Sequence, residues 1–214
     1  RSDVSLFYGN GFIFLFNVAQ TDEIINDEDY YEKGVSLYNQ GIFDESFIVF
    51  FNLSEKGYGD AVFNLSNMYY EGVGTIQNYR LALKYSWLCA LNGNERCIKK
   101  LKKVKGKVSE KELESVSQEI PVILEKNFNK LNQPKYAFKM GYWHEKFSPN
   151  EDLESAYLWY SVSVGVGIYK AMKLRDRVGK KIDKEKIGDL QKKAKEIYTK
   201  EKYFKQNSVM EENT

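Results

Sequence analysis

The feature that most constrains the fold of this chain is an internal repeat. About thirty residues from Ala82 onward align without a gap on the residues from Ala156 onward, an offset of 74 positions that places Gly93 on Gly167. A shorter offset of 36 positions places Gly57 on Gly93. Two units of about 37 residues therefore make the longer period, and units of this length are typical of stacked helical hairpins.

Each half of a unit has the pattern of an amphipathic helix. Between Asp60 and Glu71, and again between Asn78 and Leu91, apolar residues follow the i, i+3, i+4, i+7 spacing of one buried helical face. Gly72 and Gly74 mark the turn between the two segments, and Gly93 is expected to end the second one as a left-handed cap. After residue 25 no segment has the alternation of a strand. The sequence therefore predicts an all-α solenoid of about five stacked antiparallel hairpins.

The repeat also divides the chain. We expect an apolar and then acidic N-terminal segment at 1–28, a single helical-repeat domain at 29–203 and a polar tail at 204–214. The hairpins of this domain are expected near residues 30–57, 60–93, 95–131, 134–166 and 168–203.

Local signals mark several helix boundaries. Ser109 and Glu112 have the spacing of a capping box, and Asp183 is placed as an N-cap. Pro121 lies inside an otherwise helical stretch, so a kink or break is expected there, whereas Pro134 suits the first turn of the next helix.

These residues resemble the Sel-1-like repeat, a relative of the tetratricopeptide repeat with longer, glycine-marked loops. The first copy is formed by Ala61, Leu65, Ser66, Met68, Tyr69, Gly72, Val73, Gly74, Tyr79, Ala82, Tyr85, Cys89, Ala90, Gly93 and Cys97. The second, more divergent copy is formed by Met140, Gly141, Trp143, Asp152, Ala156, Trp159, Tyr160, Val164, Gly167 and Ala171. The resemblance covers roughly residues 30 to 200 and implies a scaffold that binds another protein.

Composition excludes several other classes of function. With 32 basic and 30 acidic residues, the net charge of +2 favours no nucleic-acid partner. The longest apolar stretch, residues 6–19, is interrupted and falls short of the roughly 18 apolar residues of a membrane span. One histidine and two cysteines are too few for a metal centre built from such ligands. No Ser-x-x-Lys or Lys-Thr-Gly motif is present, so we expect no enzyme and no cofactor.

Two features bear on the cellular compartment. Cys89 and Cys97 resemble the pair that ties adjacent helices together in the cysteine-rich, secreted branch of the Sel-1-like family, although buried free thiols explain them equally well. The apolar run at 6–19 is either part of a signal peptide or a segment that covers the first hairpin. We expect a periplasmic or exported protein, and otherwise a cytoplasmic one.

Two further features have simple interpretations. The lysine-rich stretch 99–107 is interleaved with Ile98, Leu101 and Val104, which indicates a half-buried helix with a solvated face, although an anionic partner would also suit it. His144 is expected at the surface or in a groove.

The register of the repeat predicts where a partner binds. The exposed sides of the first helices of two hairpins carry Asn64, Asn67 and Glu71 in one, and Lys139, Tyr142 and Lys146 in the other. We expect a non-catalytic protein-protein interaction module, and the family resemblance suggests an immunity protein that neutralises a secreted bacterial toxin. The alternative is a binder of cell-wall or anionic ligands, or a hydrolase of the cysteine-rich Sel-1-like type.

Overall fold

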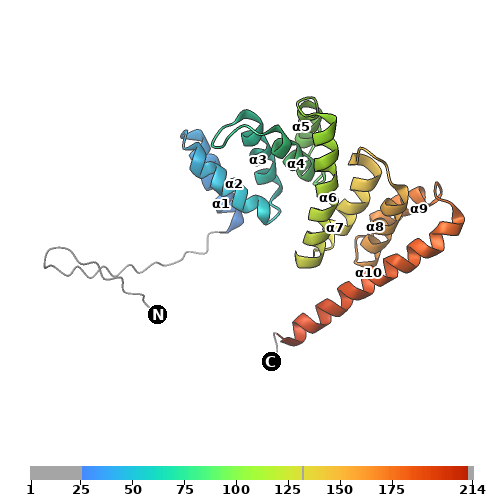
Figure 1. Cartoon of the computed structure of the whole chain (residues 1–214). Coiled ribbons are helices and arrows are strands. Elements are labelled where there is room, and N and C mark those ends of the chain that lie inside the picture. The colour runs from blue at the N-terminus through green and yellow to red at the C-terminus, as the bar shows by residue number, and fades with distance from the viewer. Residues whose placement is uncertain (1–25, 132, 212–214) are drawn as a thin grey trace.

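The computed structural model describes residues 26–131 and 133–211, and within them all regular elements are helices (Figure 1). They form five consecutive hairpins: α1 (Asp27–Asn39) with α2 (Phe43–Glu55), α3 (Gly59–Glu71) with α4 (Tyr79–Ala90), α5 (Glu95–Lys105) with α6 (Glu110–Leu131), α7 (Lys135–Tyr142) and its π-helical continuation η1 (Trp143–Phe147) with α8 (Leu153–Gly165), and α9 (Ala171–Gly179) with α10 (Lys184–Glu211). The predicted all-α solenoid of about five hairpins is confirmed.

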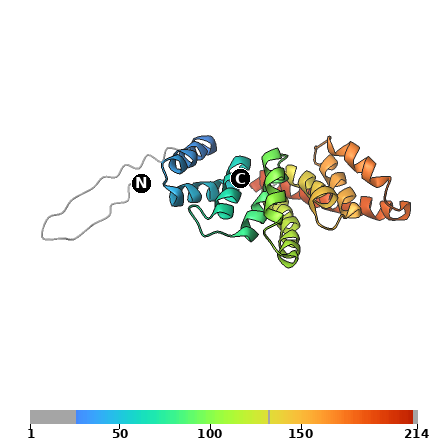
Figure 2. The same ribbon diagram turned by 90° about the horizontal axis from the view of Figure 1, so that it is seen from above.

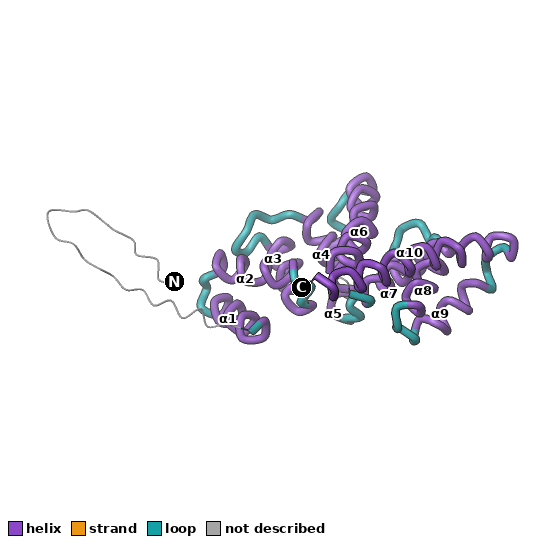
Figure 3. Tube along the Cα trace, turned by 90° about the horizontal axis from the view of Figure 1, so that it is seen from below, coloured by secondary structure: helices purple, strands orange, loops and turns teal. Residues whose placement is uncertain are grey.

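The hairpins stack in chain order into an elongated array, which Figure 2 shows from above. Each helix packs on the next one along most of the chain, and contacts between α4 and α6 and between α8 and α10 join neighbouring hairpins. The last helix, α10, turns back along the array from α9 toward the level of α6 (Figures 1 and 3). None of the described helices is both long and apolar enough to cross a membrane.

Side-chain caps fix the starts of several helices. Ser109 and Glu112 form the predicted capping box, because the Glu112 carboxylate accepts from the Ser109 backbone N–H and the Ser109 hydroxyl accepts from the Glu112 backbone N–H. Asp183 accepts from the backbone N–H of Glu185, as its predicted N-cap position requires. The same role is filled by Asn26, Asn78, Asn94 and Asp152.

Glycines allow the turns between helices to stay tight. Gly93 has the predicted left-handed backbone, with φ of +80°. Gly74 has φ of +69°, and a Cβ atom there would collide with the backbone carbonyl of Phe43. The long loop of the second hairpin therefore lies directly against the start of α2.

One continuous apolar core runs through the middle of the array. It extends from Val62 of α3 to Ala194 of α10, and at its centre the Trp87 and Trp143 rings pack edge to face at 5.2 Å. Smaller clusters hold the first hairpin and the last hairpin in place. Because each hairpin buries its apolar face against its neighbours, the array folds as a stack rather than as separate units.

Of the kink or break expected at Pro121, the break does not occur. The helix α6 runs through Pro121 from Glu110 to Leu131. Proline costs a helix interior about 3 kcal/mol. Val116, Ile120 and Leu124, which flank it on one face, are fully buried, and burying each such side chain stabilises by about 1.5–3 kcal/mol. Packing therefore outweighs the local penalty.

Helix α10 continues through residues 204–211 of the segment expected as a polar tail, past the expected end of the last hairpin near residue 203. Nothing in this stretch stops a helix, since it contains neither glycine nor proline.

Candidate functional site

The predicted partner face is divided between separate places in the structure. Asn64 and Asn67 line a cavity of about 290 Å³ between α1, α2 and α3, where the Asn64 amide donates to the Tyr31 hydroxyl at 3.2 Å. The preceding hairpin partly covers these two side chains. Repeat register alone could not reveal this cover, because it comes from the side chains of α1 and α2 in the neighbouring hairpin.

Glu71 and Lys146 each lie near one oppositely charged side chain of the same chain. The Glu71 carboxylate lies 3.9 Å from the Lys100 amine, and the Lys146 amine lies 3.0 Å from the Glu145 carboxylate. Both remain exposed, but neither lines a described cavity.

Lys139 and Tyr142 lie in the middle of the array, beside two adjoining cavities that we call the central groove. The inner cavity, of about 270 Å³, lies between α4, α6 and α7, and the outer cavity, of about 470 Å³, lies between the α4–α5 turn, α7 and the turn after α8. Both cavities are lined by Asn92 and Lys139. The Lys139 amine donates to the Asn92 amide oxygen, so this contact sits where the cavities meet.

The central groove is apolar and aromatic at its base. Leu88, Leu124 and the rings of Tyr85 and Tyr136 line the inner cavity. Burial raises the pKa of Tyr85 to about 12 and raises that of Tyr136, although a hydrogen bond with Asn127 opposes the second shift. Both phenols are therefore neutral near pH 7 and can donate hydrogen bonds.

The charges around the groove are strongly unbalanced. Among the described lining residues the only carboxylate is Glu55, whereas five lysines are present: Lys84, Lys126, Lys135, Lys139 and Lys170. Only Lys84 has a described carboxylate within 4 Å, that of Glu119 at 3.9 Å. A lining of this composition favours an anionic ligand.

Lys139 has the most perturbed amine of the groove. Burial, and then repulsion from the Lys135 charge, lower the pKa of Lys139 to about 8. Both amines lie over the Tyr136 ring, at 4.8 Å for Lys139 and 5.4 Å for Lys135. The ring partly offsets the cost of holding two like charges together.

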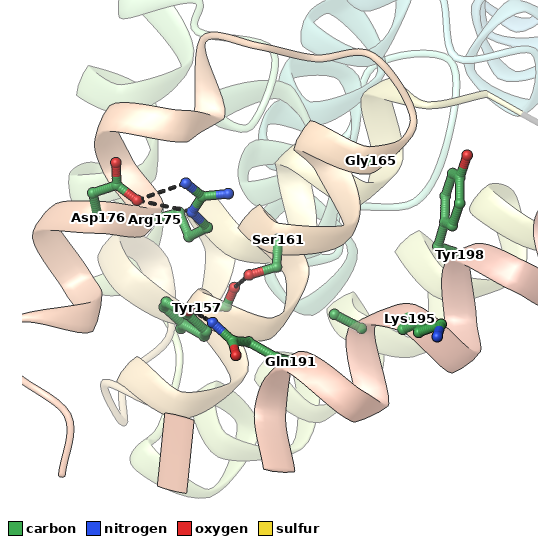
Figure 4. Close-up of a pocket in the computed structure, with 9 residues that line it drawn as sticks. Tyr157, Ser161, Gly165, Arg175, Asp176, Gln191, Lys195 and Tyr198 are labelled. Carbon is green, nitrogen blue, oxygen red and sulfur yellow. Dashed lines mark hydrogen bonds and ion pairs between the residues drawn. The ribbon is translucent and has the colours of Figure 1, made fainter. Parts of the chain in front are cut away.

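A further cavity, of about 450 Å³, lies between α8, α9 and α10 (Figure 4). Several of its polar groups are already paired within the chain. Gln191 donates to the Tyr157 hydroxyl at 3.3 Å, and Arg175 donates to the Asp176 carboxylate. Compared with this cavity, the central groove has more lysine side chains without a described carboxylate within 4 Å.

A buried carboxylate network near η1 was not anticipated from the sequence. Glu145 is 7% exposed and accepts hydrogen bonds from Tyr160 at 2.8 Å and from Arg177. Burial alone would raise the pKa of Glu145, but the hydrogen bonds from Tyr160 and Lys146 and the charges of Lys146 and Arg177 lower it. The partners are 15 and 32 residues away in the chain, so no local pattern could have indicated them.

The two cysteines are paired as a disulfide that joins α4 to α5. The Cα atoms of Cys89 and Cys97 lie 5.7 Å apart, inside the range of about 4.4–6.8 Å for disulfides, and both residues are buried. The structure thus places together the two residues that the family resemblance pairs.

The lysine-rich helix is half-buried, as the sequence indicates. Leu101 and Val104 are buried, but Ile98 is 42% exposed because Cys97 takes the inward position at that turn. The Lys100 amine lies 3.8 Å from the Tyr70 ring centroid, and the Lys105 amine lies 5.4 Å from that of Trp87. Part of this basic run therefore packs on aromatic rings of the array.

His144 is half-buried, which lowers its pKa, although the Asp152 charge opposes the shift. In the part of the chain that the structure describes, no group of three or more His, Cys, Asp or Glu side chains is placed to hold a metal ion.

No protein-family model matches the sequence, and no curated protein was found to be similar to it. A solved structure, that of c5321, a protective antigen present in uropathogenic Escherichia coli strains displaying an SLR fold, matches with 14% sequence identity and a TM-score of 0.32. The match covers 86% of this chain and 47% of the antigen, so the chain spans about half of that protein. The fold described here rests on the helical hairpins of this chain themselves.

Proposed function

We propose that the protein is a non-catalytic protein-protein interaction module that holds an acidic segment of a partner protein in the central groove. The observation that carries this proposal is the lining of the groove, where five lysines and one carboxylate surround an apolar and aromatic base. An acidic segment with interspersed apolar side chains matches that lining in both charge and hydrophobicity.

The stacked helices form a surface that suits an extended ligand. A solenoid presents side chains from successive hairpins along one continuous surface. Here the inner and outer cavities draw their lining from α2, α3, α4, α6 and α7 and from the turns after α4 and α8. A segment that crosses the Lys139–Asn92 contact would therefore touch several hairpins at once.

A more specific form of this function is toxin neutralisation. The disulfide between Cys89 and Cys97 suits an oxidising compartment, and the apolar run at 6–19, which lies outside the described residues, would suit export. An exported binding module whose partner is a toxin delivered between bacteria would act as an immunity protein. The test below separates this partner from others.

Site-directed cross-linking tests the proposal. A photoreactive phenylalanine analogue at Tyr142 of the full chain would be irradiated in lysates of the source organism and of competing bacteria. We expect one partner protein to be cross-linked through an acidic segment. Lys139→Glu should reduce the yield at least tenfold, and Lys193→Glu, which changes an exposed lysine of α10, should leave it unchanged.

The other results would overturn the proposal in distinct ways. An equal yield with Lys139→Glu would remove the groove from the binding surface. Capture of cell-wall fragments instead of protein would favour the cell-wall alternative. A toxin as the cross-linked protein would establish the immunity role.

A further inference from the structure

We propose that Lys139, with the Lys135 amine and the Asn92 amide, forms a carboxylate-binding subsite that receives one Asp or Glu side chain of the bound segment. The subsite rests on the function proposed above, and it goes further by naming the recognised group and its position. It lies where the two cavities of the central groove meet.

The geometry of α7 holds two amines at one place. Lys135 and Lys139 are four residues apart, so they lie on one face of the helix, and both amines lie over the ring of Tyr136. Neither amine has a described carboxylate within 4 Å. A carboxylate of a bound ligand would complete this arrangement.

Asn92 holds the Lys139 amine at the boundary between the cavities. Its side-chain oxygen accepts from Lys139, which ties α7 to the α4–α5 turn. Because an amide is neutral, it orients the amine without neutralising it. The Lys139 amine keeps its remaining N–H donors for an incoming carboxylate.

The groups that face Lys139 are mostly cationic or neutral. Those on its own helix and in the outer cavity are Lys135, Tyr136, Tyr142 and Lys170. Those across the inner cavity are Glu55, Lys84, Tyr85 and Lys126. Glu55 is the only carboxylate in this lining, so the potential at Lys139 is positive and disfavours its protonated form. A bound carboxylate would therefore stabilise protonated Lys139.

Binding should therefore be linked to proton uptake. An amine with a pKa of about 8 is about nine-tenths protonated at pH 7 and about one-tenth protonated at pH 9. A carboxylate that raises the pKa of Lys139 to about 10 would bind about tenfold more weakly at pH 9 than at pH 7. At pH 8 each binding event would take up about half a proton.

The test uses the full chain and two synthetic peptides. One peptide is rich in glutamate and carries a single tryptophan, and the other has glutamine at every glutamate position. Calorimetry at pH 7, 8 and 9, in buffers of different ionisation enthalpy, measures affinity and proton uptake. We expect the pH dependence only with the glutamate peptide.

Two variants separate this role from a purely structural one. Lys139→Arg should keep the affinity and lose the pH dependence, because arginine stays charged throughout this range. Lys139→Gln, which carries no charge at any pH, should bind about a hundredfold more weakly at pH 7, because a pKa that rises from about 8 to about 10 on binding corresponds to that factor. Near-ultraviolet circular dichroism of both variants reports whether the fold is retained.

Several results would overturn the subsite. They are absence of glutamate-peptide binding, binding that does not change from pH 7 to 9, a pH dependence that persists in Lys139→Arg, and an oligonucleotide that competes as well as the peptide does. If any of these occurs while Tyr142 still cross-links a partner protein, the proposed function stands and only the subsite falls.

Discussion

The phenol of Tyr160 donates a 2.8 Å hydrogen bond to the buried carboxylate of Glu145, which ties α8 to η1. Arg177 of α9 binds the same carboxylate, so three elements of the C-terminal half meet at one side chain. A carboxylate buried in this way is stable only while its partners remain. The contact thus holds the fourth hairpin and the fifth together.

Replacing Tyr160 by phenylalanine should destabilise the fold by about 1–3 kcal/mol, because the buried Glu145 carboxylate would lose one hydrogen-bond donor. Urea denaturation followed by far-ultraviolet circular dichroism measures the effect. Tyr169→Phe is the control, since Tyr169 is 71% exposed, and its change should stay within about 0.5 kcal/mol. Equal effects of the two substitutions would contradict the structural role of Glu145.

The same carboxylate should make stability depend on pH. Its partners lower the pKa of Glu145 below the ordinary value of about 4.3 that it has in the unfolded chain. The stabilisation by ionised Glu145 is therefore complete above that value and is lost as the pH falls through the folded-state pKa. Denaturation midpoints of the wild type and Glu145→Gln should differ at pH 7, and the difference should shrink only as the pH falls from about 4.3 through the lower folded-state pKa of Glu145. A constant difference would contradict this assignment.

Opening the Cys89–Cys97 disulfide should cost about 2–3 kcal/mol, as expected for the short loop that it closes. The matched variant is Cys89→Ser combined with Cys97→Ala, because Ser163 and Ala171 occupy the corresponding positions one long repeat later. Its stability should equal that of the reduced wild type. Thiol labelling of the unfolded, unreduced protein should find no free cysteine, and two labelled thiols would disprove the bond.

The six residues predicted from repeat register include Asn67 and Tyr142, which the structure places in different cavities. Replacing either by alanine should weaken partner binding without unfolding the chain. Because the sites share no lining residue, the two losses in binding free energy should add. A loss with Tyr142→Ala alone would restrict the partner to the central groove, and unchanged affinity in both variants would refute the surface assignment.

The helical architecture follows from the sequence because its signals are local. The spacing of apolar residues, the Ser109–Glu112 capping box and the left-handed Gly93 each depend on neighbours within one or two turns. Pro121 shows the limit of such signals. The sequence predicts that proline destabilises the helix interior, but the burial of neighbouring side chains that outweighs this cost depends on other helices.

The candidate site could be predicted only in part. Repeat register identified Lys139 and Tyr142, which do line the central groove, but it placed Asn64 and Asn67 on an open face that α1 partly covers. Lys139 and its partner Asn92 are 47 residues apart, and no pattern in the sequence connects them.

The sequence by itself determined that the chain is a series of helical hairpins, since the spacing of apolar residues, the caps and the glycine turns are local signals and the repeat is visible along the chain. Only the tertiary structure decided which lysines lie together without a carboxylate partner, and which carboxylate is buried among Tyr160 and Arg177. The physical reason is that desolvation and charge pairing act through space. They are set by the side chains that stacking brings into contact, whatever their separation along the chain.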